Sequence, residues 1–102
     1  MTTYQLNGTL VTPTVTTTPA ILDMPRGCNG VIIVNPSTAN TLYVHLVPQG
    51  ATAPSAAEVL RGLRVYPNGQ ISLSILNEAP YGCDIYLSMS ASTQQINAYG
   101  VI

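Results

Sequence analysis

Apolar and polar residues alternate along much of the chain, as they do in short strands that bury one face. The alternation is clearest in residues 41–47, 70–75 and 84–89. Residues 31–34 are continuously apolar, which is typical of a central strand covered on both faces. The residues expected to face the core are Leu42, Val44, Leu46, Ile71, Leu73, Ile75, Ile85, Leu87 and Met89.

Turns rich in Asn, Pro, Gly and Ser separate these segments. The spacing predicts about seven or eight short strands, and both this number and the distance between turns are typical of an all-β sandwich. We therefore predict a small antiparallel β-sandwich, jelly-roll-like, in residues 20–102. Ser55 and Glu58 match the capping-box pattern, so one short helical turn is expected over residues 56–61, ending at Gly62.

Residues 1–19 have a different character. Six Thr and two Pro occupy residues 9–19, a composition that favours extended backbone and removes donors from a strand ladder. Two interpretations are open: an edge strand of the sandwich, or an extended arm that pairs with the sheet of a neighbouring subunit. In the second, Thr12, Val15 and Thr18 are candidate contact residues.

Charge is scarce. Charged residues make up 7% of the chain, against about 25% in ordinary soluble domains. Two explanations are open. The protein is a subunit of an assembly in which most of its surface contacts other proteins, or it is a Ser/Thr-rich β domain that hydroxyl and amide groups keep soluble. With no Lys, three dispersed Arg and a net charge of −1, nucleic acid is not an expected partner. A membrane is not one either, because no apolar run approaches the ~20 residues of a spanning helix.

Catalytic groups are sparse as well. His45 is the sole histidine, so nucleophilic catalysis has one candidate base, and the four carboxylates lie in or beside turns. Cys28 and Cys83 are too few and too far apart in sequence to form a metal site alone. We expect no enzyme activity, metal or cofactor. The two thiols are expected to be reduced, although a disulfide between them stays an alternative. We expect no secretory signal, and we expect the protein to stay in the cytosol unless a larger particle carries it out.

Six Tyr are the aromatic residues of the chain. The strand phases direct Tyr43 and Tyr86 away from the core, on the face that carries His45. Such Tyr side chains suit ordinary amphipathic surface, protein contacts or sugar stacking. The remaining candidate interaction residues are Tyr43, His45 and Tyr86 on this face and Arg61 in the loop over residues 49–61.

From residue 32 onward, the order of features resembles small virion proteins of tailed bacteriophages. The matching elements are Asn35-Pro36-Ser37, Leu42-Tyr43-Val44, residues 50–54, Pro67-Asn68-Gly69, Ile85-Tyr86-Leu87-Ser88 and residues 96–102. Proteins of this kind decorate capsids or form parts of fibres. The helical segment at 56–61 and the Thr-rich N-terminus depart from the pattern.

The resemblance implies a structural virion protein on the head surface, of the capsid decoration or cement type, which bridges capsomers. Its implied partners are the major capsid protein and further copies of itself, with a trimer favoured. The alternative is a receptor- or glycan-binding module of a head fibre or tail. A third interpretation is a bacterial β domain unrelated to any virus.

Overall fold

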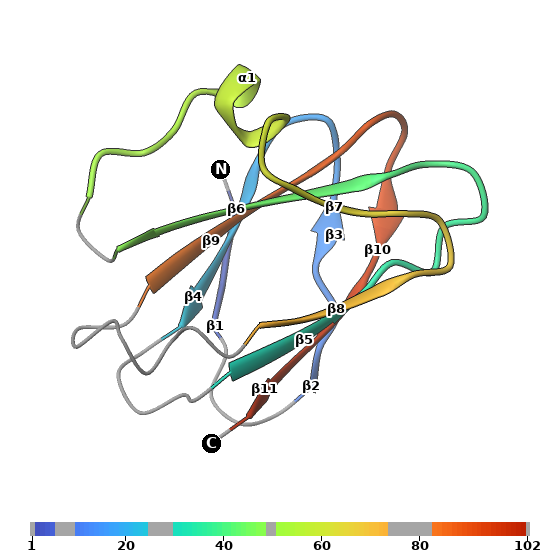
Figure 1. Ribbon diagram of the computed structural model, residues 1–102, viewed down its shortest axis with the longest axis horizontal. Helices are drawn as coiled ribbons and strands as arrows, with labels where there is room; N and C mark the ends of the chain where they lie inside the picture. Colours follow the sequence, from blue (N-terminus) through green and yellow to red (C-terminus); the bar gives the residue numbers. More distant parts are fainter. Residues whose placement is uncertain (1, 6–9, 25–29, 49–50, 74–82, 102) are drawn as a thin grey trace.

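The structure is a computed structural model that describes residues 2–5, 10–24, 30–48, 51–73 and 83–101. Within these residues the chain is all-β, as predicted, with eleven short strands and one short helix (Figure 1). The count exceeds the predicted seven or eight for two reasons. Three strands form in the N-terminal region, where at most one edge strand was expected, and the last predicted strand is divided into two.

The first layer is a five-stranded sheet in the order β1-β4-β9-β6-β7. β1 is parallel to β4, and every other pair in this sheet is antiparallel. The long strands β9 and β6 lie at its centre and β1 and β7 at its edges. The bounds are β1 (Thr3–Gln5), β4 (Ala20–Met24), β9 (Cys83–Met89), β6 (Leu42–Pro48) and β7 (Leu63–Val65).

The second layer is a four-stranded antiparallel sheet in the order β2-β11-β5-β8. A small two-stranded sheet, β10-β3, accompanies the two layers. The bounds are β2 (Leu10–Val11), β11 (Asn97–Val101), β5 (Gly30–Val34), β8 (Gln70–Leu73), β10 (Gln94–Gln95) and β3 (Thr14–Val15).

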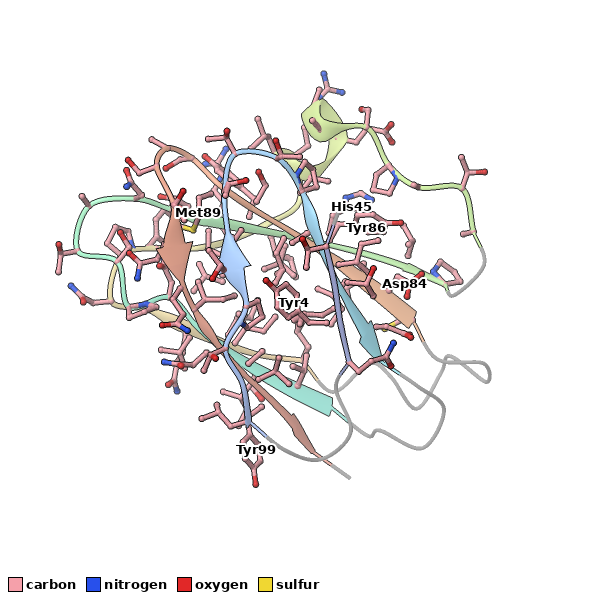
Figure 2. All side chains as sticks on the ribbon, turned by 180° about the vertical axis from the view of Figure 1, so that it is seen from behind. Tyr4, His45, Asp84, Tyr86, Met89 and Tyr99 are labelled. Carbon is pink, nitrogen blue, oxygen red and sulfur yellow. The ribbon has the colours of Figure 1, made fainter. Side chains whose placement is uncertain are left out.

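The described part of the N-terminal region is built into the sandwich, so the expectation of a free arm is wrong and the edge-strand interpretation holds. β1 and β2 pair with β4 and β11 of the same chain, and the Met89 N–H donates to the Thr16 carbonyl at 2.8 Å. Tyr4, labelled in Figure 2, packs against the core, and its hydroxyl accepts from the Thr14 N–H at 3.2 Å. Val15 is 0% exposed, so it is a core residue and not an interaction residue.

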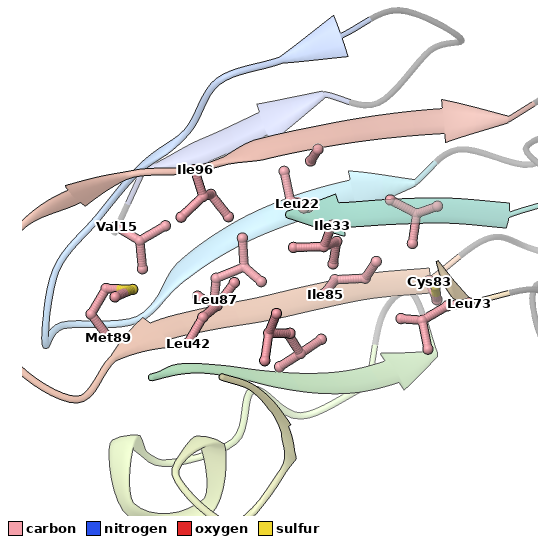
Figure 3. Packing of buried hydrophobic residues seen from close by; sticks show 14 residues of the cluster. Val15, Leu22, Ile33, Leu42, Leu73, Cys83, Ile85, Leu87, Met89 and Ile96 are labelled. Carbon is pink, nitrogen blue, oxygen red and sulfur yellow. The ribbon is translucent and has the colours of Figure 1, made fainter. Parts of the chain in front are cut away.

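The core lies between the two layers (Figure 3). Leu42, Val44, Ile85, Leu87, Met89 and Leu73 are buried, and Leu46 and Ile71 pack against them, as the alternation predicted. Ile75 lies outside the described residues. One expectation is wrong: on β5, Ile32 and Val34 are only partly buried, because this strand covers the core with one face and turns the other outward. The strand covered on both faces is β9.

The predicted capping box is present at the start of the helix α1 (Ala56–Val59). The Ser55 hydroxyl accepts from the Glu58 N–H at 3.2 Å, and the Glu58 carboxylate accepts from the Ser55 N–H at 3.1 Å. The helix stops before residue 61, and Gly62 then lets the chain cross closely over β6. A Cβ on Gly62 would collide with the carbonyl oxygen of Val44, so this crossing needs glycine.

Candidate interaction surfaces

The outer face of the five-stranded sheet carries Tyr43 and His45 on β6 and Tyr86 on β9, on the side the alternation predicted. His45 and Tyr86 are directly paired across the two strands and lie close together in Figure 2. Tyr86 is 4% exposed, however, so the prediction of an accessible Tyr86 is wrong. α1 packs against both β6 and β9. The alternation of residues within a strand cannot predict that a helix packs on its outer face. Burial, and secondarily the Asp84 carboxylate, raise the pKa of the Tyr86 phenol.

Two predicted residues, His45 and Arg61, lie close enough to Glu58 of α1 for their charges to act on its carboxyl group. Hydrogen bonds from Ser55 lower the pKa of the Glu58 carboxyl, and the charges of His45 and Arg61 lower it further. His45 is half-buried beneath this segment, whereas Glu58 and Arg61 are exposed. The cluster supports the local conformation of residues 55–61.

Tyr43 lies on the same face of β6 as His45, two residues away, and the two Thr candidates lie in the N-terminal region. The Tyr43 ring is half-buried, and the guanidinium carbon of Arg64 lies 6.0 Å from its centroid, within cation–π range. Thr12 and Thr18 are exposed; the Thr12 carbonyl accepts from Gln95, and the Thr18 N–H donates to the Thr16 hydroxyl. Tyr43, His45 and Tyr86 therefore share one face of the five-stranded sheet, whereas Thr12 lies beside β10 and Val15 lies in the core.

Two groups of exposed apolar side chains were not predicted from the strand pattern. The first group lies beside β7. Leu60, Leu63 and Tyr66 are all exposed, and Tyr66 is the most exposed of them at 62%. The described Arg residues, Arg61 and Arg64, lie among them and are also exposed. We call residues 60–66 the β7 edge, because β7 ends the order of the five-stranded sheet.

A second apolar row crosses the outer face of the four-stranded sheet. Leu10 and Tyr99 are directly paired, at 58% and 48% exposed, and Tyr99 is paired on its other side with the partly buried Ile32. We call the following set the uncharged face: Leu10, Tyr99, Ile32, Val34, Asn97, Gln70 and Ser72. The signal for Tyr99 was present in the sequence, since Ile96 and Ala98 alternate with it and are buried.

Charge is segregated away from this face. The charged side chains of the described residues all belong to the five-stranded sheet or to the α1 segment: Asp23, Asp84, Glu58, Arg61 and Arg64. Among the described residues, the outer face of the four-stranded sheet thus carries apolar and uncharged polar side chains, and the five-stranded sheet with the α1 segment carries the charges.

Two carboxylates of the five-stranded sheet form an acidic pair. Asp23 and Asp84 are directly opposite each other on β4 and β9, and Gln5 donates to the Asp23 carboxylate at 2.8 Å. Partial burial is the largest cause of a raised pKa at Asp84, followed by the charge of Asp23 and a hydrogen bond with it. In the parts of the chain that the structure describes, no three His, Cys, Asp or Glu side chains come together as a metal site would require.

The acidic pair predicts a pH dependence of stability. Because the pKa of Asp84 is raised above 3.8 on folding, the folded state holds this proton more tightly, and stability should fall as pH rises from 3.8 through the raised pKa. Asp84→Asn should therefore stabilise the protein more at pH 7 than at pH 4, measured by urea unfolding. Glu58→Gln is the matched control with the opposite sign, since the lowered pKa of Glu58 contributes stability that is lost on acidification. An Asp84→Asn variant that loses more stability at pH 7 than at pH 4 would contradict the account.

Cys83 is buried in the core, and Cys28 lies outside the described residues, so the state of the two thiols stays a prediction. No described helix has the length and apolar character needed to span a bilayer. Comparison of the chain with protein-family models, with curated proteins and with solved structures gives no match.

Proposed function

We propose that this protein is a structural virion protein of the capsid decoration type, which docks on the shell through the uncharged face. The observation that carries the proposal is the exposed Leu10–Tyr99 pair on a sheet face without a described charge. Cores of protein interfaces are depleted in charge and enriched in Tyr, so this face has the composition of a docking surface. The phage context comes from the resemblance of residues 32–102 to small virion proteins.

The mechanism is mechanical. Burying a large apolar side chain contributes about 1.5–3 kcal/mol, so two half-exposed anchors give a modest affinity for each copy. Many copies that bridge neighbouring capsomers act together, and their joint attachment is far stronger than one contact. A homotrimer bound to the major capsid protein on the head surface is the arrangement proposed, with no catalytic step and no cofactor.

The receptor- or glycan-binding alternative is weaker on this structure. It relied on Tyr43 and Tyr86 as stacking rings, and Tyr86 is buried. Tyr66 and Tyr99, the exposed Tyr side chains of the described residues, would have to take that role. The number of copies per particle separates the two functions.

The proposal predicts the result of removing the two anchors. The double variant Leu10→Ser, Tyr99→Ser should bind shells of the major capsid protein at least tenfold more weakly, because its apolar contacts are lost. The measurement is co-sedimentation with shells that lack the protein, over a concentration series. Tyr66→Ser is the matched control, since it removes another exposed Tyr, which follows β7 of the five-stranded sheet, and should bind normally. Equal losses in both variants, or none in the double variant, would contradict docking through the uncharged face.

A further inference from the structure

The β7 edge combines three features that the proposed function does not use. β7 is the last strand in the order of its sheet, and an edge strand presents backbone N–H and C=O groups to its open side. At its end, the Val65 and Tyr66 carbonyls already accept from the Asn35 amide at 2.9 and 3.4 Å. Three exposed apolar side chains lie along residues 60–66. Arg61 and Arg64, the described cations, are exposed on the same segment.

The register of β7 assigns each of its side chains to a face. Leu63 pairs with Val44 and Val65 with Leu42, and both partners are fully buried core residues. Directly paired residues share a face, so Leu63 and Val65 lie on the core side of the sheet. Val65 is 1% exposed, whereas Leu63 remains 45% exposed, so the core is incompletely covered at this edge.

Arg64 lies on the opposite face. It pairs with Tyr43, whose ring it covers, and its guanidinium is exposed beside that ring. Glu58, the nearest described carboxylate in sequence, accepts a hydrogen bond from Ser55 at the start of α1. The outer face of β7 therefore carries a cation, and the core face carries an uncovered leucine.

We propose that the β7 edge binds an extended acidic peptide segment of a partner protein, which adds to the sheet as a further strand. Side chains alternate between faces, so the added strand has the pattern apolar–acidic–apolar. An apolar residue covers Leu63 on the core side, and a carboxylate lies over Arg64 on the outer side. Backbone pairing supplies affinity, and the alternate side chains supply specificity. This site is separate from the uncharged face and does not depend on the virion assignment.

The test uses the full chain and synthetic peptides. The probe is an acetylated, amidated Ser-Val-Glu-Val-Ser peptide, titrated into isotope-labelled protein and followed by amide NMR shifts. Its controls are the same peptide with Lys for Glu, and the Glu peptide with Pro for both its second Val and the Ser that follows. Alternate N–H groups of an added strand face β7, so two adjacent Pro keep the charge and remove a ladder donor in either phase. The Glu peptide should bind best, with shifts centred on residues 63–66 and Tyr43.

Charge reversal gives the sharpest result. Arg64→Gln should weaken binding of the Glu peptide roughly two- to fivefold, as expected for one exposed ion pair. Arg64→Glu should invert the preference, so that the Lys peptide binds better than the Glu peptide. Tyr99→Ser, on the other sheet, should change neither affinity.

Any one of the following four outcomes of the peptide titrations would overturn the proposal, and so would a fifth, from the oligomeric state of the protein. The four are no binding of the Glu peptide, equal binding of the Pro-containing peptide, shifts centred away from β7, or an unchanged preference in Arg64→Glu. A concentration-dependent dimer that Arg64→Glu disrupts would likewise overturn it and assign the edge to a second copy of the chain.

Discussion

Deletion of residues 1–18 is expected to abolish folding. The deletion removes β1, β2 and β3, so β4 and β11 each lose the partner on one side and β10 loses its partner in the two-stranded sheet. It also removes Val15 from the core, together with Tyr4 and Val11 that pack against it. Each such side chain contributes about 1.5–3 kcal/mol when fully buried. With the lost strand pairing, the sum is comparable to the whole net stability of a small domain, about 5–15 kcal/mol.

Circular dichroism and amide NMR of the truncated protein check this result. The thermal transition should disappear and the amide signals should lose their dispersion. Thr12→Ala and Thr18→Ala are the matched controls, because both residues are exposed in the same region and should leave stability within about 0.5 kcal/mol. A truncated protein that melts cooperatively would show that residues 1–18 are an appendage, as an arm would be.

Asn35→Ala is expected to cost about 2–4 kcal/mol, because it leaves several buried polar groups without partners. The Asn35 side chain is fully buried and donates to the carbonyls of Asn40 and Val65, both at 2.9 Å. Its oxygen accepts from the Ser37 N–H at 3.1 Å. One side chain thus joins the turn after β5 to the end of β7.

Urea unfolding measures this loss. Asn35→Asp keeps the acceptor for Ser37 but removes both donors and buries a charge, so at pH 7 it should be at least as damaging as Asn35→Ala. Thr38→Ala, an exposed position in the same turn, is the control and should be neutral. Full stability of Asn35→Asp at pH 7 would contradict the role given to the amide donors.

The sequence was sufficient to predict the class of fold and the inward face of β6 and β9, because a period of two follows directly from strand geometry. The capping box of α1 was equally readable, since Ser55 and Glu58 interact within one turn. These features depend on local geometry alone.

Long-range packing decided the features that the sequence did not predict. Val15 lies in a Thr-rich segment that has the composition of an arm, and its burial depends on pairing with β10, some eighty residues away along the chain. Tyr86 has the phase of a surface residue, but α1 packs on its strand. Asn35 begins an Asn-Pro-Ser segment that has the composition of a turn, and its buried hydrogen bond to Val65 is seen only in the folded chain.

The interaction residues followed the same division. Tyr43 and His45 were assigned to the correct face from the alternation within one strand. The exposed Leu10–Tyr99 pair forms because β2 pairs with β11, which the sequence did not predict. The segregation of charge depends on which strands join which sheet. Composition showed that charge is scarce, and the sheet order shows which strands carry the charges of the described residues.

The most direct test of the central claim is the ratio of this chain to the major shell protein in purified particles, measured by quantitative gel densitometry. A decoration protein is expected at about one copy per shell subunit, or one trimer per few subunits. A few copies to a few dozen per particle would contradict decoration and favour a fibre or tail location with receptor binding. Complete absence from the particles would contradict the virion assignment itself.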